Sequence, residues 1–185
     1  MLFNKIKERT QLKKAINKIS LPKGKAQLTY DYLKSLSKDI RAQEIAYHIM
    51  ECVLTKTNED NLILMNGYSS GMKMVATTWH LQGEINNGGF CQYFDNNESL
   101  YTKEILREYY QTTKDSLDLL GNSKIKEAFV EAFALFESSQ REPNKQRNAD
   151  VKWNRLDNIY YENEEELLIN RDEYIDKNLN EFVVN

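Results

Sequence analysis

Apolar residues recur at helical spacing along most of the chain. Over residues 40–54 they stand three and four positions apart, which is typical of a helix with one buried face. We see no convincing strand, repeat or low-complexity run. The pattern predicts an all-α, single-domain, multi-helix bundle. The expected helices cover residues 3–20, one or two stretches within 26–57, 68–81, 89–95, a helix from Ser99 to Gly121, one capped by Asn122 or Ser123, one around Trp153, and 164–182.

Glycine and proline mark the expected helix boundaries. The two prolines, Pro22 and Pro143, interrupt the helical pattern, and five of the seven glycines fall between residues 67 and 89. Gly83 and Gly121 follow helical stretches, where a left-handed residue ends a helix at little cost. We therefore expect helices to stop at both positions.

Residues 83–96 read Gly-Glu-Ile-Asn-Asn-Gly-Gly-Phe-Cys-Gln-Tyr-Phe-Asp-Asn. In this signature we expect a tight turn, aromatic anchors in the core, and a polar side chain that caps a helix end or bonds the turn's backbone. A functional alternative is that paired glycines before a helix leave backbone amides open to hold an anion. We favour the structural role, because phosphate loops normally follow a strand and bring a Lys, Ser or Thr that is missing here. The residues concerned are Asn87, Gly88 and Gly89 for the turn, Phe90, Tyr93 and Phe94 for the anchors, and Asn96 for the polar contact.

With this signature the chain resembles a bacterial DNA-mimic protein family, of the nineteen-kilodalton type, whose domain was formerly of unknown function. The similarity extends over about residues 35 to 182 and includes the run from Trp153 to Asp157. The resemblance implies an all-helical fold and a homodimer. For the family's namesake it also implies an acidic surface that a DNA-binding transcription factor mistakes for DNA.

Charge is unevenly distributed along the chain. The formal net charge is −3, yet residues 1–25 carry eight basic residues against Glu8 alone, which leaves a net charge of −10 on residues 26–185. Residues 157–185 hold nine acidic residues and two basic ones. We therefore divide the chain into a basic N-terminal helical arm, 1–25, and an acidic helical domain, 26–185.

Acidic and apolar residues separate cleanly on the expected terminal helix. One interpretation is a solvated outer face. The other is a carboxylate array that imitates phosphates and binds a basic site on a DNA-binding protein or transcription regulator, more weakly as salt rises. We favour a non-catalytic protein-interaction module of the second kind. Its expected acidic face comprises Glu165, Glu166, Asp172, Glu173 and Asp176, with Asp95 and Glu98 after the signature.

The basic arm offers an alternative function. It could bind nucleic acid or an anionic membrane surface as an adaptor, or fold back on the acidic domain of the same or a second subunit. No tyrosine lies within the arm to stack on bases. We therefore expect self-docking or solvation, and not direct nucleic-acid binding.

A third alternative is an uncharacterised enzyme with a site near His80 and Glu84. These residues, like Glu44 and His48, stand four apart on one helical face, which is acceptable ligand spacing. Neither histidine lies in a recognised motif, and no nucleophile accompanies a base and its orienting acid. We expect no catalytic residue, cofactor or metal.

Location follows from hydropathy and cysteine usage. The chain has no run of about 18 apolar residues to span a membrane, and its N-terminus lacks the continuous hydrophobic stretch of a signal peptide. Cys52 and Cys91 are too few for a disulfide framework, so we interpret both as buried thiols. We expect a cytoplasmic protein.

Overall fold

The computed structural model describes residues 27–54, 68–100, 103–141 and 146–184. Every element in these ranges is a helix, which confirms the all-α prediction. The basic arm, 1–25, and Pro143 lie outside the described residues. Within them, no helix combines the length and the apolar character needed to cross a membrane. The elements are α2 (Tyr30–Ser35), α3 (Lys38–Leu54), α5 (Ser70–Leu100), α6 (Lys103–Leu119), α7 (Ser123–Arg141), α8 (Gln146–Lys177) and the 3-10 helix η2 (Leu179–Phe182).

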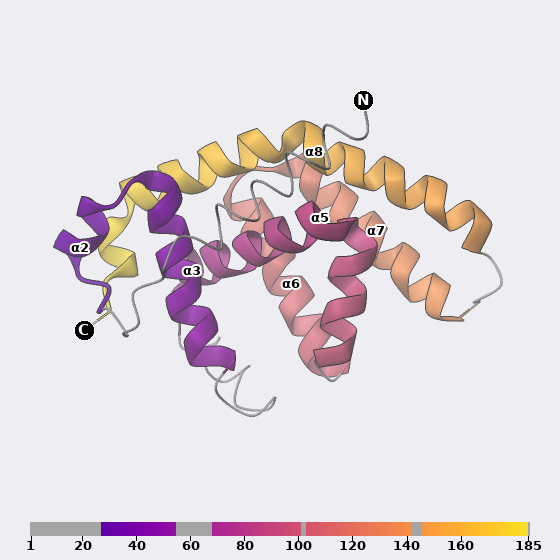
Figure 1. Cartoon of the computed structure of the whole chain (residues 1–185), viewed down its shortest axis with the longest axis horizontal. Coiled ribbons are helices and arrows are strands. Elements are labelled where there is room, and N and C mark those ends of the chain that lie inside the picture. Colours follow the sequence, from indigo (N-terminus) through magenta and orange to yellow (C-terminus); the bar gives the residue numbers. More distant parts are fainter. Residues whose placement is uncertain (1–26, 55–67, 101–102, 142–145, 185) are drawn as a thin grey trace.

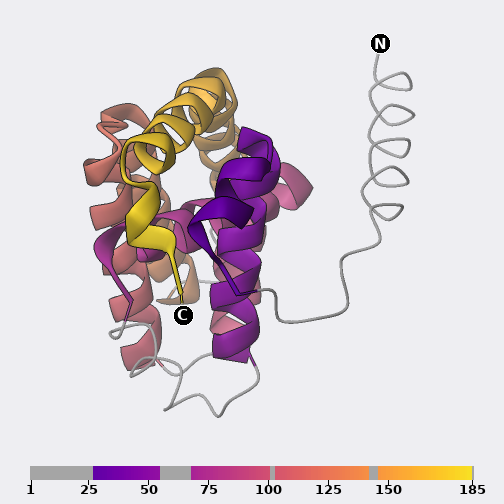
Figure 2. The same ribbon diagram turned by 90° about the vertical axis from the view of Figure 1, so that its left-hand side faces the viewer.

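Helix α8 runs along one side of the whole molecule, and the other helices lie beneath it (Figure 1). Helix α5 is central and packs against α3, α6, α7 and α8. Viewed from the end that carries α2, the chain shows α2 and α3 on one side and α6 on the other, with α8 across the top (Figure 2). This arrangement leaves the side of α8 that faces away from α5 uncovered by the other described helices.

The core is built from aromatic rings. The signature residues Phe90, Tyr93 and Phe94 are all 0% exposed, which confirms their predicted role as anchors. The ring centroid of Phe94 lies 5.1 Å from that of Tyr110 and 5.3 Å from that of Phe136, distances typical of aromatic pairs. The signature thereby fixes α5 against α6 and α7.

The prediction that a helix ends at Gly83 was wrong. Gly83 lies inside α5, on an exposed side, and the helix continues past it to a kink at Gly88 and Gly89. Only Gly89, with φ of 79°, adopts the left-handed region in α5. Glycine permits that conformation without requiring it, so its presence alone does not locate the break.

The predicted stop at Gly121 is confirmed. Gly121 has φ of 68°, its N–H donates to the Asp118 carbonyl, and the Asn122 N–H donates to the Leu117 carbonyl. These two bonds form a Schellman motif. Asn122 Oδ1 then accepts from the Ile125 N–H at 3.3 Å, so Asn122 caps α7 as predicted.

Two other helix boundaries differ from the prediction. The helix expected from Ser99 begins at Lys103, since α5 continues to Leu100. The helices expected around Trp153 and over 164–182 are one helix, α8, followed by η2. No glycine or proline occurs between residues 144 and 182, so nothing in that stretch breaks the helix at its middle.

Candidate functional site on helix α8

Two side chains of α8 hold the kink of α5. The non-helical backbone at Gly88 and Gly89 disturbs the regular hydrogen bonds around it, so nearby backbone groups need other partners. The Asp157 carboxylate accepts from the Phe90 N–H at 2.8 Å. The Tyr161 hydroxyl donates to the Ile85 carbonyl at 2.8 Å. Because Asp157 and Tyr161 are four residues apart, they lie on one face of α8 and clamp both sides of the kink.

The paired glycines were also considered as a site where backbone amides hold an anion. The amide that follows them already donates to a carboxylate of the same chain, that of Asp157. A Cβ on Gly89 would lie 2.3 Å from Asp157 Oδ2, so only glycine lets the carboxylate approach. Burial raises the pKa of Asp157, and the bond from Phe90 opposes that shift.

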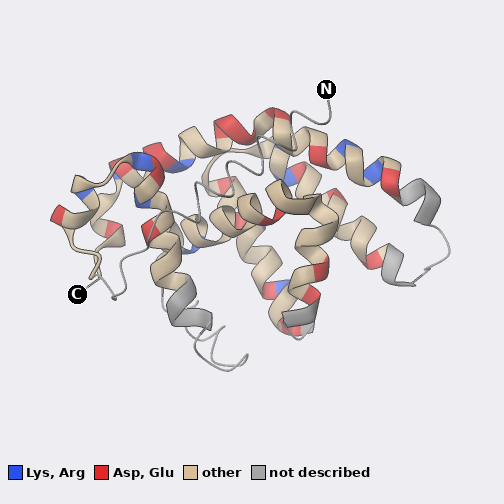
Figure 3. Cartoon of the chain, in the orientation of Figure 1, with Lys and Arg blue, Asp and Glu red and all other residues tan. Residues whose placement is uncertain are grey.

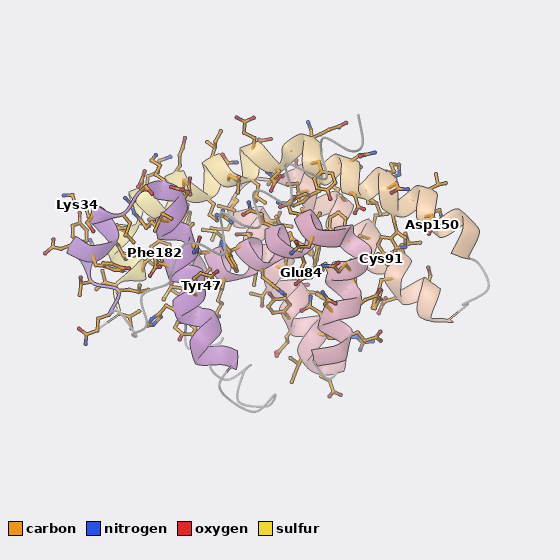
Figure 4. The ribbon with its side chains drawn as sticks, viewed as in Figure 1. Lys34, Tyr47, Glu84, Cys91, Asp150 and Phe182 are labelled. Carbon is orange, nitrogen blue, oxygen red and sulfur yellow. The ribbon has the colours of Figure 1, made fainter. Side chains whose placement is uncertain are left out.

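Polar side chains on the concave side of the kink connect its two arms. Glu84 Oε2 accepts from Gln92 Nε2 at 3.1 Å and from Asn96 Nδ2 at 2.7 Å. Asn96, expected to cap a helix end or bond the turn's backbone, thus reaches a side chain across the kink. Asn86 Nδ2 donates to Glu164 Oε1 of α8 at 2.5 Å, while Asn87 is exposed. Glu84 lies at this corner of α5 (Figure 4).

His80 and Glu84 come close without forming a tight pair. His80 Nδ1 lies 2.7 Å from the Tyr109 hydroxyl, and His80 Nε2 lies 3.8 Å from Glu84 Oε1. Burial lowers the pKa of His80, although the Glu84 carboxylate acts in the opposite direction. Among the described residues, no three His, Cys, Asp or Glu side chains are arranged to hold a metal ion.

His80 predicts a pH-dependent stability. Its pKa in the folded chain lies below the ordinary 6.5, so below pH 6.5 the unfolded chain binds a proton that the folded chain resists. We expect the free energy of unfolding to be highest above pH 6.5 and to fall as the pH drops toward the lowered pKa. Urea unfolding at pH 7 and pH 5 should show a smaller loss for His80→Gln than for the wild type. Parallel losses in the two proteins would contradict this assignment.

The expected acidic face divides into parts with different surroundings. Glu165 and Glu166 are exposed on α8. Glu173 is exposed too, but the Lys177 ammonium lies 2.9 Å from its carboxylate. Asp172 and Asp176 lie toward α3 and contribute to the contact between the two helices. Helical periodicity predicts the direction in which each carboxylate points from the axis of α8. It does not predict which other helix lies against that carboxylate.

Asp176 belongs to an ion-pair cluster that joins α2, α3 and α8. Its carboxylate pairs with Lys38 Nζ at 2.8 Å and with Arg41 Nη1. Arg41 is buried and also donates to the carbonyls of Leu33 at 2.7 Å and Leu36 at 3.0 Å. The bonds from Lys38 and Arg41 hold the pKa of Asp176 below its usual value. Asp176 therefore has a structural role in the folded chain.

Asp172 is half-buried beside this cluster. Burial raises the pKa of its carboxyl, and the Arg171 and Lys38 charges oppose that shift. Asp172 Oδ1 is fully covered, with no hydrogen-bond partner among the described residues. A covered carboxylate at a helix contact is a poor element of an open binding face.

Asp95 and Glu98 lie on a different part of the molecule. Both belong to the second arm of α5, which leaves α8 at the kink and runs away from it (Figure 1). Asp95 accepts from Cys91 Sγ at 3.6 Å. Burial, together with the Asp95 carboxylate, raises the pKa of the Cys91 thiol to about 11. We expected a buried thiol at Cys91, but its side chain is only half-buried. The side chain of Cys52 lies outside the described residues.

The predicted face omitted the exposed carboxylate of Glu162 on α8. Glu162 is exposed and precedes Glu165 and Glu166 by three and four residues, so the three share the outer surface of the helix. We call Glu162, Glu165 and Glu166 the α8 outer face. No basic residue occurs between Leu156 and Asn170, and Figure 3 shows acidic residues along this helix. Extending the helical wheel by one turn before Glu165 would have found Glu162.

Comparison with known protein families gives a match. The sequence pattern of the DMP19-like protein family fits residues 66–178, which span α5, α6, α7 and α8. No curated protein and no solved structure matches the chain. The matched region is shorter than the resemblance over residues 35 to 182 suggested, but it contains the signature, the kink and the two side chains of α8 that clamp it. Because the match covers more than half of its residues, the chain belongs to the DMP19-like protein family.

Proposed function

We propose that this protein is a non-catalytic protein-interaction module whose α8 outer face binds the DNA-contacting surface of a DNA-binding regulator. The observation that carries the proposal is the exposure of Glu162, Glu165 and Glu166 without an ion-pair partner among the described residues. Membership of the family is compatible with a DNA-mimic role. A cytoplasmic location and a homodimer belong to the same proposal.

The physical argument rests on like charges kept together. Carboxylates three and four residues apart on a helix repel each other by a few tenths of a kcal/mol per pair. A helix selected only for stability would place lysines among them, as Lys177 stands beside Glu173. A partner with lysines and arginines arranged to bind phosphates would relieve this repulsion, and its binding would weaken as salt rises.

Affinity capture from a native lysate tests the proposal. The bait is the full chain, compared with the triple variant Glu162→Gln, Glu165→Gln, Glu166→Gln, and bound proteins are eluted in a salt gradient. We expect the wild type to capture a DNA-binding protein that duplex DNA displaces. The triple variant should retain less than about a tenth of it, since three lost ionic contacts each weaken binding.

A matched control separates this face from general acidity. Glu104, Glu108 and Glu127 are exposed on α6 and α7 and have no ion-pair partner among the described residues. Changing these three to Gln alters the net charge by the same amount and should leave capture unchanged. Equal capture by both triple variants, or capture that DNA does not displace, would remove the α8 outer face from the function.

A further inference from the structure

The α8 outer face combines charge with an exposed apolar residue. Ile169 follows Glu165 and Glu166 by four and three residues, so it lies on the same side of α8, and it is 50% exposed. An aliphatic side chain beside uncompensated carboxylates matches a ligand that alternates cationic and apolar groups. The phosphates of DNA would offer a ligand no such apolar contact. The α8 outer face therefore fits a ligand with both charged and apolar groups, which is a basic amphipathic polypeptide.

Residues 1–25 of this chain have that chemistry. They carry eight basic residues and one acidic residue, with Phe3, Ile6, Ile16 and Ile19 among the lysines. This spacing predicts a basic amphipathic helix over 3–20. The remainder of the sequence has a net negative charge, so residues 1–25 are its strongest complement to the α8 outer face.

The described chain begins where this segment can reach the face. The Leu28 carbonyl accepts from the Val184 N–H at 3.0 Å, and α2 packs against η2, which directly follows α8. Residue 28 is therefore fixed near the C-terminal end of α8. From Lys177 back to Glu162 the helix spans about 22 Å at 1.5 Å per residue, whereas an 18-residue helix covers about 27 Å. Residues 21–26 add a connection of roughly 3.3 Å per residue when extended.

The described residues already contain a contact of this kind. Lys38 and Arg41, the first basic residues of α3, pair with Asp176 near the C-terminal end of α8. Basic residues closer to the N-terminus thus pair with a carboxylate at one end of α8. Further along the same helix, the α8 outer face has no such cover among the described residues.

We propose that residues 1–25 dock on the α8 outer face of the same chain and compete there with the basic surface of the partner. The docking stands on the charges and geometry of this chain alone, while its role as a competitor rests on the proposed function. High salt, or a partner with a denser basic surface, displaces the segment and opens the face.

Zero-length cross-linking of the full chain tests the docking. A water-soluble carbodiimide joins a lysine amine to a carboxylate only when the two are in contact, and mass spectrometry of the digest identifies the pairs. We expect links from lysines of residues 1–25 to Glu162, Glu165 or Glu166, strongly reduced at high salt. In a mixture of isotope-labelled and unlabelled chains, each link should join residues of one chain. Links spread evenly over the exposed carboxylates of α6 and α7, or links between two chains, would overturn the docking.

A second measurement separates docking from competition. In the full chain, the combined changes Lys13→Gln, Lys14→Gln and Lys18→Gln should weaken the binding of residues 1–25 to the α8 outer face. They leave the residues of that face unchanged. We expect this variant to bind an oligolysine peptide, used as a defined basic probe, several-fold more tightly than the wild type. It should also capture the DNA-displaceable partner at higher salt. If the cross-links form but neither affinity changes, competition is overturned; if the probe responds and no such partner is captured, the docking stands and the proposed function fails.

Discussion

Gly89→Ala is expected to lower the free energy of unfolding by about 3 to 5 kcal/mol. Gly89 has φ of 79° and ψ of −176°, a backbone region that costs other residues about 1 to 3 kcal/mol. The new Cβ would also lie 2.3 Å from Asp157 Oδ2 and displace the carboxylate that accepts from the Phe90 N–H. Leaving that amide unsatisfied costs about 1 to 3 kcal/mol more. Urea unfolding followed by circular dichroism measures the loss.

Gly83→Ala is the matched control, and it should have the opposite sign. Gly83 is exposed inside α5, and no atom lies within 4 Å of a Cβ added there. Alanine in a helix interior is more stable than glycine by about 0.5 to 1 kcal/mol. If Gly89→Ala cost less than about 1 kcal/mol, α5 would be able to straighten, and the clamp by Asp157 and Tyr161 would not define the fold.

Gly83 and Gly89 show why the sequence located some helix ends and not others. At Gly121 the stop signal is local, because the Schellman bonds and the Asn122 cap involve only neighbouring residues. The kink at Gly89 depends on Asp157, which is 67 residues away in the sequence. In the sequence, Gly83 and Gly89 look equally able to interrupt a helix. Tertiary contacts decide that the break occurs at Gly89, and local helix propensity does not contain them.

The sequence predicted which side of α8 carries the carboxylates, but it did not predict which other helices contact them. Helical periodicity correctly placed Glu165 and Glu166 on the exposed side of α8. It could not indicate that α3 covers Asp172 and pairs with Asp176, since that contact joins segments more than 130 residues apart. The same limit applies to Arg41, because its sequence position does not show that its guanidinium is buried against carbonyl groups.

The kink and the α8 outer face are mechanically connected. Asp157 and Tyr161 of α8 form hydrogen bonds with the kink of α5. The α8 outer face starts at Glu162, the residue that follows Tyr161 in the same helix. The packed helix already orders the backbone that carries these side chains, so a partner would have to order only the side chains, and this reduces the entropic cost of association. Under the proposed function, the signature would support binding by fixing the position of α8.

Arg41→Ala should destabilise the fold by about 2 to 4 kcal/mol, because three elements lose a shared donor. Its guanidinium satisfies the Leu33 and Leu36 carbonyls at the end of α2 and pairs with Asp176 of α8. Removing one member of a fully buried pair costs about 3 to 5 kcal/mol, and the loss here is smaller because the Asp176 side chain is 35% exposed. Asp176 keeps Lys38, which moderates the loss. Thermal and urea unfolding of the two proteins give the difference.

Lys38→Ala removes the other cation from the same carboxylate and supplies the control. The Lys38 side chain is 58% exposed, whereas that of Arg41 is 10% exposed, and exposed ion pairs contribute about 0 to 1 kcal/mol. We expect Lys38→Ala to cost less than about 1 kcal/mol. Equal losses in the two variants would mean that charge alone joins α3 to α8. The larger loss for Arg41 would show that its burial and its bonds to the α2 carbonyls fix that end of α8, and with it the position of the α8 outer face.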